Sequence, residues 1–338
     1  MSADLEYRKR HVVVGQHNTS YVSGLGDDPF VNKSRSAMDV AKWMKQFTLK
    51  VQPNDDPDCL LFDMIGVDTS IANALRRILI AEVPTVAIHR VYISNNTSVM
   101  QDEVLSHRLG LLPIKVNPVL FEYPPEDPVV TMIDSIPEAD PTFNLVFRLN
   151  ITCERDPSGR LQNETVYSRD LTWVPIGDQK EKFKGNPPKF VHDKIIIVKL
   201  AEGQTIDLTV HCAKGIGRDH AKWSPVATAT YRILPSIQFK KSLTQEQAKE
   251  LVEMCPLDVF EIDPIDDKVS AKHPRRCTVC RECIRKPGWD DLIQLGRVRD
   301  HFIFNIESTG SVPPKQLVLT ALDILLSKCE RLANNLES

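Results

Sequence analysis

The segment that decides the fold spans residues 68–79 and reads Asp-Thr-Ser-Ile-Ala-Asn-Ala-Leu-Arg-Arg-Ile-Leu. Its apolar residues Ile71, Leu75 and Ile78 recur every three to four positions, which places them on one face of a helix. Asp68 or Thr69 can cap the first turn, because the side-chain oxygen of either residue can accept from backbone N–H groups that have no helical partner. We therefore predict an amphipathic helix whose apolar face packs against another element.

A second and longer helix is predicted from Pro314 to Leu336. Apolar residues step along it by four and three positions, as in the seam of a coiled coil. They are Val318, Leu322, Leu325, Cys329, Leu332 and Leu336. Such a stripe can pack on the chain's own sheet or on another protein, and the pattern alone leaves both readings open.

Strand patterns fill most of the remaining chain. Runs of β-forming residues predict strands at 11–14, 47–51, 60–65, 86–93, 143–152, 194–200, 206–212 and 302–306. Breakers are frequent at 154–190, which predicts surface loops there. The expected fold class is α+β.

Composition excludes several classes of protein. The chain has 338 residues, of which 42% are hydrophobic and 26% charged, as in a globular protein. No apolar run reaches the ~18 residues of a membrane span, so we expect no membrane association. The net charge is −3, without the basic excess of a nucleic-acid-binding surface. Contact with nucleic acid is therefore expected to be indirect only.

No catalytic motif is found in the sequence. The glycine pair in Gly215-Ile216-Gly217 lacks the third glycine and the following helix of a dinucleotide-binding loop. We expect instead a tight loop that carries His220, Lys222 and Trp223 outward, where a tryptophan beside a lysine can anchor a partner. The alternative is that Trp223 closes a core.

Four cysteines form the strongest local signal for a metal site. Cys277, Cys280 and Cys283 are spaced C-x-x-C-x-x-C, as in ferredoxins, and Cys255 is followed by proline like the distant fourth ligand of such a cluster. Residues 259–262 predict one strand of a small ferredoxin-like insert. Four thiolates can hold a [4Fe–4S] cluster or, as the second choice, zinc. Spacing does not decide between these groups and a set that binds nothing.

Four segments in order along the chain resemble the α-type subunits of multisubunit RNA polymerases. They are residues 68–84, 101–114, 215–226 and 298–310. The likeness covers about residues 45–335. Within the family, the chain is most similar to the larger α-like subunits shared by eukaryotic RNA polymerases I and III. Residues 92–152 hold no cysteine, whereas polymerase II counterparts carry a zinc-binding cluster in this domain.

The resemblance implies a discontinuous dimerisation domain made of residues 44–90 and 229–338. A strand-rich insertion domain would occupy residues 91–228, and the ferredoxin-like insert residues 241–289 of the dimerisation domain. Residues 1–43 would form an N-terminal arm.

The resemblance also implies a function: a non-catalytic assembly subunit of DNA-dependent RNA polymerases I and III. It would pair with a smaller α-like subunit and contact the second-largest subunit and other core subunits, in transcription of rRNA, tRNA and 5S RNA. Its location would be the nucleus, including the nucleolus. The expected partner-binding residues are Ile71, Leu75, Arg77, Ile78, Trp223, Val318, Leu322, Leu325, Cys329 and Leu332. The competing hypothesis, a free-standing iron–sulfur redox protein, accounts only for the cysteine segment.

Overall fold

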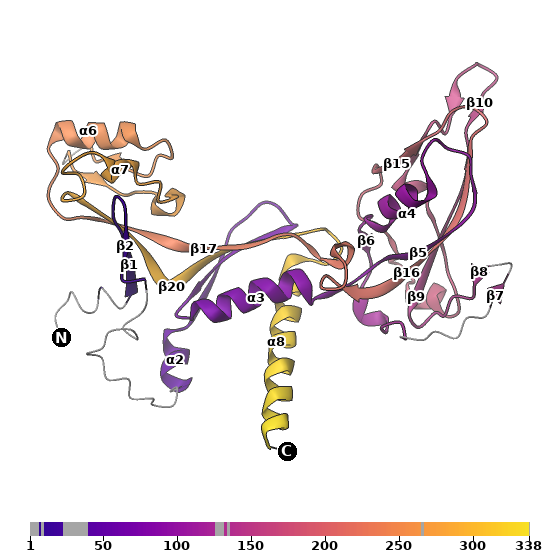
Figure 1. The fold of residues 1–338 in the computed structure, drawn as a ribbon, viewed down its shortest axis with the longest axis horizontal. Coiled ribbons are helices and arrows are strands. Elements are labelled where there is room, and N and C mark those ends of the chain that lie inside the picture. The colour runs from indigo at the N-terminus through magenta and orange to yellow at the C-terminus, as the bar shows by residue number, and fades with distance from the viewer. Residues whose placement is uncertain are drawn as a thin grey trace. The chain divides into compact units, whose positions relative to one another are not determined.

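The structure, a computed structural model, is a mixed α/β fold and describes residues 7, 10–22, 40–125, 132–133, 136–264 and 267–337 (Figure 1). Much of the predicted N-terminal arm, residues 1–43, lies outside the described residues. No helix in the described ranges is both long enough and apolar enough to span a membrane.

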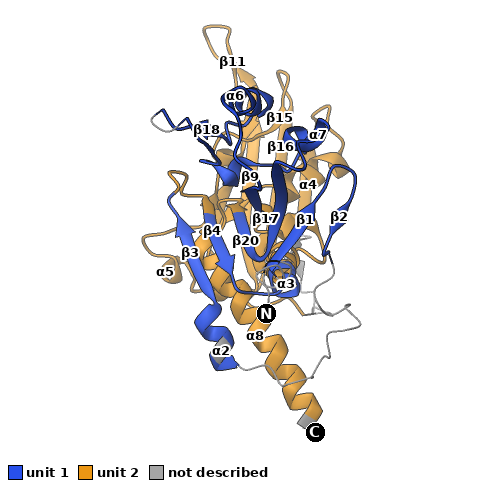
Figure 2. Cartoon of the chain, turned by 90° about the vertical axis from the view of Figure 1, so that its left-hand side faces the viewer, with its two compact units in different colours: residues 1–53, 61–73, 230–305 blue, residues 54–60, 74–229, 306–338 orange. Residues whose placement is uncertain are grey.

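The chain divides into two compact units (Figure 2). Unit 1 comprises residues 1–53, 61–73 and 230–305. Unit 2 comprises residues 54–60, 74–229 and 306–338. Each unit is therefore assembled from three stretches of sequence. Pairing between residues far apart in the sequence must hold the three stretches of each unit together.

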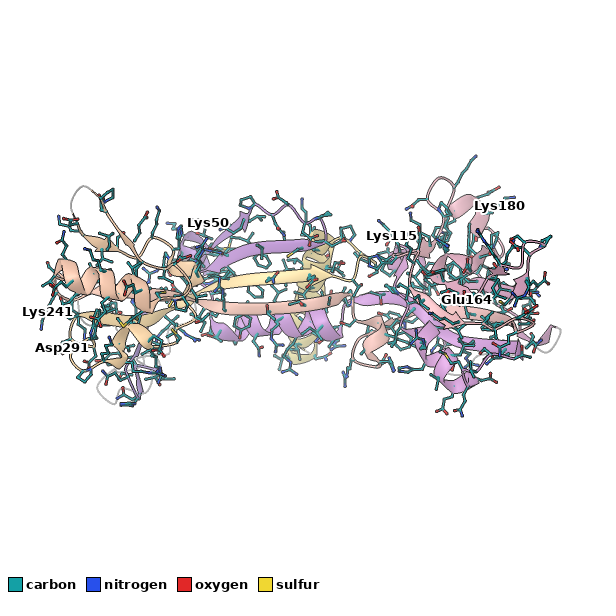
Figure 3. The ribbon with its side chains drawn as sticks, turned by 90° about the horizontal axis from the view of Figure 1, so that it is seen from above. Lys50, Lys115, Glu164, Lys180, Lys241 and Asp291 are labelled. Atoms are coloured by element: carbon teal, nitrogen blue, oxygen red, sulfur yellow. The ribbon has the colours of Figure 1, made fainter. Side chains whose placement is uncertain are left out.

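A six-stranded sheet organises unit 1. Its strands run in the order β2 (Thr19–Ser20), β1 (His11–Val14), β20 (Ile293–Ser308), β4 (Cys59–Ile65) and β3 (Thr48–Gln52), and β17 (Val226–Phe239) also pairs with β20. Figure 3 shows the long strands side by side, with Lys50 on β3. The strands predicted at 11–14, 47–51, 60–65 and 302–306 are confirmed, although β20 is much longer than predicted.

Aromatic side chains form the core beneath this sheet. The rings of Phe62 and Phe304 are stacked with centroids 4.8 Å apart. The ring of Tyr231 meets Phe302 edge-on at 5.4 Å. Phe62, Phe302 and Phe304 are almost completely buried, and burying a large apolar side chain contributes roughly 1.5–3 kcal/mol. These contacts join β4, β17 and β20 through their side chains as well as through hydrogen bonds.

A buried carboxylate, Asp63 of β4, ties a distant loop to this sheet. Arg275 Nη1 and Nη2 donate to the two oxygens of Asp63 at 2.5 and 2.8 Å. His301 Nε2 lies 3.0 Å from Asp63 Oδ2. Burial alone would raise the pKa of Asp63, but the hydrogen bonds and charges of Arg275 and His301 outweigh it and lower the pKa. The carboxylate is therefore ionised at neutral pH.

Residues 240–292 connect β17 to β20 and leave the sheet as an excursion whose ends are joined, since Lys240 N donates to Leu292 O at 2.8 Å. It contains α6 (Gln245–Met254), β18 (Glu261–Ile262), β19 (Val269–Ser270), η5 (Pro274–Arg276) and α7 (Glu282–Arg285). The strand predicted at 259–262 is shortened to β18. Asp258 has a left-handed backbone (φ 49°), which interrupts the extended run just before it.

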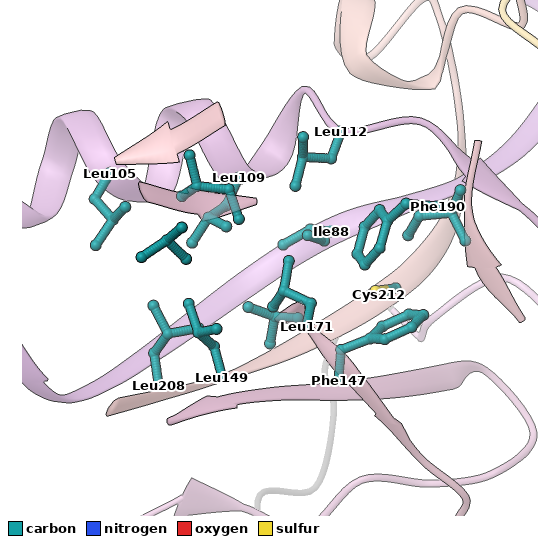
Figure 4. Packing of buried hydrophobic residues seen from close by; sticks show 14 of the residues in the cluster. Ile88, Leu105, Leu109, Leu112, Phe147, Leu149, Leu171, Phe190, Leu208 and Cys212 are labelled. Carbon is teal, nitrogen blue, oxygen red and sulfur yellow. The ribbon is translucent and has the colours of Figure 1, made fainter. Parts of the chain in front are cut away.

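A second sheet forms the centre of unit 2. Its order is β13 (Thr172–Val174), β9 (Asn144–Thr152), β16 (Thr205–Ile216) and β5 (Pro84–Asn96). Helix α4 (Asp102–Gly110) contacts β5 and buries Leu105 and Leu109. Figure 4 shows these leucines facing Ile88, Leu149 and Leu208 in one apolar cluster. The strands predicted at 86–93, 143–152 and 206–212 are confirmed.

Short elements fill the loops of unit 2. They are β6 (Ile114–Lys115), η2 (Pro118–Leu120), β7 (Met132–Ile133), β8 (Ile136–Pro137), β10 (Glu154–Arg155), β11 (Leu161–Gln162), β12 (Thr165–Tyr167), η3 (Ser168–Asp170), α5 (Gln179–Lys182), β14 (Lys189–Phe190), β15 (Ile196–Lys199) and η4 (Ala221–Trp223). The loops predicted at 154–190 thus contain short strands and turns. The remaining helices are α2 (Val40–Gln46), α3 (Thr69–Ala81) and α8 (Pro314–Glu337).

Substitution of Asp63 tests the buried charge network. Asp63→Asn should lower the free energy of unfolding by about 1–3 kcal/mol, because the buried hydrogen bonds from Arg275 and His301 lose their charged acceptor. The wild-type carboxylate has a lowered folded-state pKa, so its stabilisation is complete above the unfolded-state pKa and is lost as the pH falls through the folded-state pKa. Urea unfolding between pH 7 and pH 2 should therefore show a weaker acid dependence in Asp63→Asn.

The matched control is the exposed pair Arg155–Glu202 of unit 2, whose Nη2–Oε2 distance is 2.7 Å. Glu202→Gln should leave stability unchanged, since exposed ion pairs contribute little. Equal stability of Asp63→Asn and wild type would show that the Asp63 network does not stabilise unit 1.

Candidate functional site

The amino end of α3 is capped as the sequence predicts. Ser70 N donates to Asp68 Oδ1 at 2.8 Å, and Ile71 N donates to Asp68 O at 3.1 Å. The hydrogen bonds from Ser70 lower the pKa of Asp68, so the cap stays charged near neutral pH. The helix ends at Ala81, and β5 begins at Pro84.

The apolar face of α3 is divided between the core and the surface. Leu75 is 1% exposed and Ile78 is 3% exposed. Ile71 and Arg77, in contrast, are exposed. The prediction that Leu75 and Ile78 contact a partner directly is corrected: they pack inside the chain, because their face of the helix is covered. Ile71 and Arg77 remain available on the surface.

The first turns of α8 are core and its last turns are surface. Leu317 and Ala321 are 0% exposed, and Val318 is 8% exposed. Val318 therefore belongs to the core. This corrects the prediction that Val318 binds a partner. Farther along, Lys328 Nζ donates to Glu82 Oε1 at 2.5 Å, next to the end of α3. This ion pair holds the middle of α8 beside the last turn of α3.

From Leu319 onward, one side of α8 presents apolar side chains to solvent. Leu322 is 39% exposed, Leu332 is 62% exposed, and Cys329 is also exposed, whereas Leu325 is half-buried. Leu319 and Leu326, at 47% and 58%, also belong to the exposed surface and were missed by the sequence reasoning. The adjacent pairs Val318-Leu319 and Leu325-Leu326 were the available signal, since one buried stripe cannot use both members of such a pair. The exposed apolar set is Leu319, Leu322, Leu326, Cys329, Leu332 and Leu336, and we call it the α8 stripe.

The glycine motif at 215–217 is a packing motif. A Cβ at Gly215 would lie 2.4 Å from the ring of Trp223, and one at Gly217 would lie 2.2 Å from Ile80 O. Trp223 is 7% exposed and donates from Nε1 to Ala213 O at 3.0 Å. The prediction that the loop carries Trp223 outward is wrong, because the ring fills the space that Gly215 leaves. Lys222 Nζ lies 4.4 Å from the centre of that ring.

The four cysteines line one cavity in unit 1. Cys255, Cys277, Cys280 and Cys283 surround it together with Val259 and other apolar residues, and its volume is about 20 Å³. That is roughly the space of one water molecule. As they are placed, the described residues contain no group of three His, Cys, Asp or Glu side chains that could hold a metal ion. The four thiols thus line one cavity but, as placed, do not form a ligand set for a metal ion.

Residues 277–283, which we call the cysteine loop, have two strained backbone positions. Val279 and Arg281 have positive φ angles of 60° and 71°, and a β-branched residue rarely adopts this conformation. Val279 N donates to Cys277 Sγ at 3.3 Å. Burial, followed by the neighbouring thiols, raises the pKa of Cys283 to about 12. Without a cation nearby, Cys283 is therefore a protonated thiol at neutral pH.

Comparison with known proteins identifies relatives over the whole chain. The profile described as the RNA polymerase Rpb3/Rpb11 dimerisation domain matches residues 61–329. The subunit RPAC1 of DNA-directed RNA polymerases I and III from Homo sapiens is 41% identical over 349 residues, which cover 100% of this chain and 98% of the relative. The protein of the same name from Saccharomyces cerevisiae is 41% identical, covering 90% and 92%. The polymerase II subunit rpb3 of Dictyostelium discoideum is 34% identical, covering 80% and 89%.

Two substitutions in α8 test the division of the helix into core and surface. Leu317→Lys should destabilise the chain by about 3–5 kcal/mol, because it buries an uncompensated charge. Leu332→Lys should change stability by less than about 0.5 kcal/mol, since it adds a cation to an exposed position near a helix carboxyl end. Thermal unfolding of the isolated chain measures both. Similar losses for the two variants would contradict the assignment.

Proposed function

The chain belongs to the RNA polymerase Rpb3/Rpb11 dimerisation family, and on this premise we propose that it is an assembly subunit of DNA-directed RNA polymerases I and III. It is 41% identical to subunits of polymerases I and III from two organisms, and 34% identical to a polymerase II subunit. Its role is to pair with a dimerisation partner inside the polymerase complex. The observation that carries this role is the exposed α8 stripe.

The α8 stripe has the chemistry of a helix-pairing surface. Its residues recur at intervals of three and four and stay exposed to the last turn, where Leu336 is 87% exposed. A contiguous apolar surface of this kind typically marks a protein–protein contact. We propose that the partner is the smaller α-like subunit, which packs a similar helix against the stripe. Ile71, which is exposed on α3, is a further candidate for contact with a partner.

A second surface is proposed around Arg77. This guanidinium is exposed on α3, whereas Leu75 and Ile78 on the same helix are buried. A charge in this position suits the rim of an interface, where it affects recognition more than affinity. We propose that it faces the second-largest polymerase subunit. The chain itself is non-catalytic in this proposal, and any contact with nucleic acid is through the complex.

The domain plan follows from the same proposal. Residues 44–90 and 229–338 make the dimerisation domain, with residues 91–228 as the insertion domain and 241–289 as the ferredoxin-like insert. The complex transcribes rRNA, tRNA and 5S RNA, which locates the chain in the nucleus, including the nucleolus.

We also propose that the four cysteines hold a [4Fe–4S] cluster, with zinc as the alternative. The support is their common cavity, the left-handed turns at Val279 and Arg281, and the N–H···S hydrogen bond to Cys277. Hydrogen bonds to sulfur stabilise metal-bound thiolates and tune their chemistry. Such a site would be structural, since the insert has a small apolar core of its own.

Pairing with the smaller α-like subunit tests the role of the α8 stripe. Leu332→Lys should reduce co-purification with the smaller α-like subunit by at least roughly 30-fold, because buried anchors in an interface typically contribute 2 kcal/mol or more. Co-expression followed by affinity capture and gel filtration measures the loss. Unchanged pairing would remove the stripe from the interface.

Two matched variants make this test specific. Glu330→Gln changes an exposed polar residue of α8 that is not part of the stripe, keeps the side-chain size, and should pair normally. Arg77→Glu should also keep the pair but weaken capture of the second-largest subunit. Loss of pairing in Arg77→Glu would show that Arg77 contacts the smaller subunit, and that the two proposed surfaces are not separate.

Metal content tests the cysteine site. Anaerobic purification followed by elemental analysis should find about four irons per chain for a cubane cluster, or one zinc for the alternative. Cys280→Ser, at the exposed position of the four, should abolish stoichiometric metal while leaving unit 2 folded. Neither metal at stoichiometric level in wild type would show that the four cysteines bind none.

A further inference from the structure

The hairpin formed by β1 and β2 is docked on the cysteine loop. Strand β1 pairs antiparallel with the start of β20, with Val13 opposite Gly296 and Val14 opposite Leu295. The turn is closed by Gly15 N, which donates to Asn18 O at 2.9 Å. The hairpin lies more than 260 residues away in sequence from the loop that it meets, so neither segment alone determines this contact.

Three hydrogen bonds join Gln16, at the hairpin turn, to the cysteine loop and the residues just after it, and the longest runs from Gln16 Nε2 to Lys286 O at 3.4 Å. Gln16 Nε2 donates to Ile284 O at 2.7 Å, one residue after Cys283. Arg281 Nη1 donates to Gln16 O at 3.2 Å, from the position between Cys280 and Cys283. The Arg281 backbone is in the left-handed conformation. The side chain that reaches the hairpin therefore starts from the strained turn of the cysteine loop.

Apolar packing reinforces this contact. Val14 is 6% exposed and belongs to the same buried cluster as Cys283, Ile284 and Leu295. The backbones of β1 and β20 approach each other closely at Gly296, since a Cβ there would be 2.7 Å from Val12 O. One face of the hairpin is thus part of the core around the thiols, and β20 has no space there for a larger side chain.

A pocket that is open to solvent borders the hairpin. A cavity of about 580 Å³ lies between the hairpin, the cysteine loop, β20 and the start of α3. Val12, Val14, Arg281 and Arg297 are among its lining residues. Among the described residues, nothing packs on the hairpin side chains where they face this open pocket, so we expect the hairpin to open locally at a lower free energy than the core strands. Its closed position is supported by Val14, by the short ladder with β20 and by the three hydrogen bonds of Gln16.

We propose that the β1–β2 hairpin is a cover for the cysteine loop, and that closure of the hairpin and the left-handed conformation of the loop stabilise each other through Gln16 and Arg281. An open hairpin would expose Cys283 to solvent and loosen the loop. A rearranged loop would in turn withdraw Arg281 and release the hairpin. Because such coupling is reciprocal, each segment must respond to a change in the other.

The experiment measures both directions in the full-length chain. Arg281→Asn removes the guanidinium while keeping a residue that tolerates positive φ. It should raise amide hydrogen exchange in residues 11–14 by at least roughly tenfold, as expected for loss of one hydrogen bond from a charged group. Gln16→Ala should raise the rate of Cys283 alkylation by a similar factor in protein treated with a chelator. His17→Ala, at the exposed neighbouring position, should change neither rate.

Exchange in the β9–β16 ladder of unit 2 serves as the internal reference, so that local opening is separated from global unfolding. Unchanged exchange at residues 11–14 in Arg281→Asn, or unchanged Cys283 alkylation in Gln16→Ala, would overturn the coupling. The measurement does not depend on whether the cysteines hold a metal, because it is made on free thiols. Failure of the metal proposal and failure of this one are therefore distinguishable.

Discussion

The backbone ladder along β20 is the interaction on which the rest of unit 1 depends. This strand pairs with β1, β4 and β17, whose residues come from widely separated parts of the sequence. Its buried N–H and C=O groups must find partners, because unpaired buried backbone groups are costly. The long strand meets that requirement only if the three other segments converge on it. The cysteine-containing excursion and the N-terminal hairpin are therefore positioned by the same strand, and through it they come into contact.

Side-chain interactions add specificity to this ladder. Asp63 would be expensive to bury alone, yet Arg275 and His301 surround it and keep it ionised. Arg275 lies two residues before Cys277, so the Asp63 network holds one end of the cysteine loop, while Gln16 contacts the loop near its other end. A loop with left-handed backbone at Val279 and Arg281 needs such anchors, because strain of about 1–3 kcal/mol per residue persists only where the surroundings impose it.

The proposed function follows from the exposed leucines of α8 in unit 2. Helix α8 buries Leu317 and Ala321, and the last turns of the helix keep their leucines in solvent. An isolated chain gains nothing from exposed leucines, whereas a subunit of a complex uses them to bind its partner. The Glu82–Lys328 ion pair holds the middle of this helix in place. The stripe is thus carried on a preorganised helix, which lowers the ordering cost of association.

The sequence by itself determined the family, most of the strands, the span of both long helices and the grouping of four cysteines, because local periodicity, capping residues and motif spacing are written along the chain. It also predicted that apolar residues on α3 and α8 share a face. Only the tertiary structure decided which of them are covered: Leu75, Ile78 and Val318 lie in the core, whereas Leu326 lies on the surface. It likewise placed Trp223 over Gly215 and Gln16 against the cysteine loop. The physical reason is that periodicity defines the neighbours of a residue within its own element, while burial depends on which distant segment packs against that element.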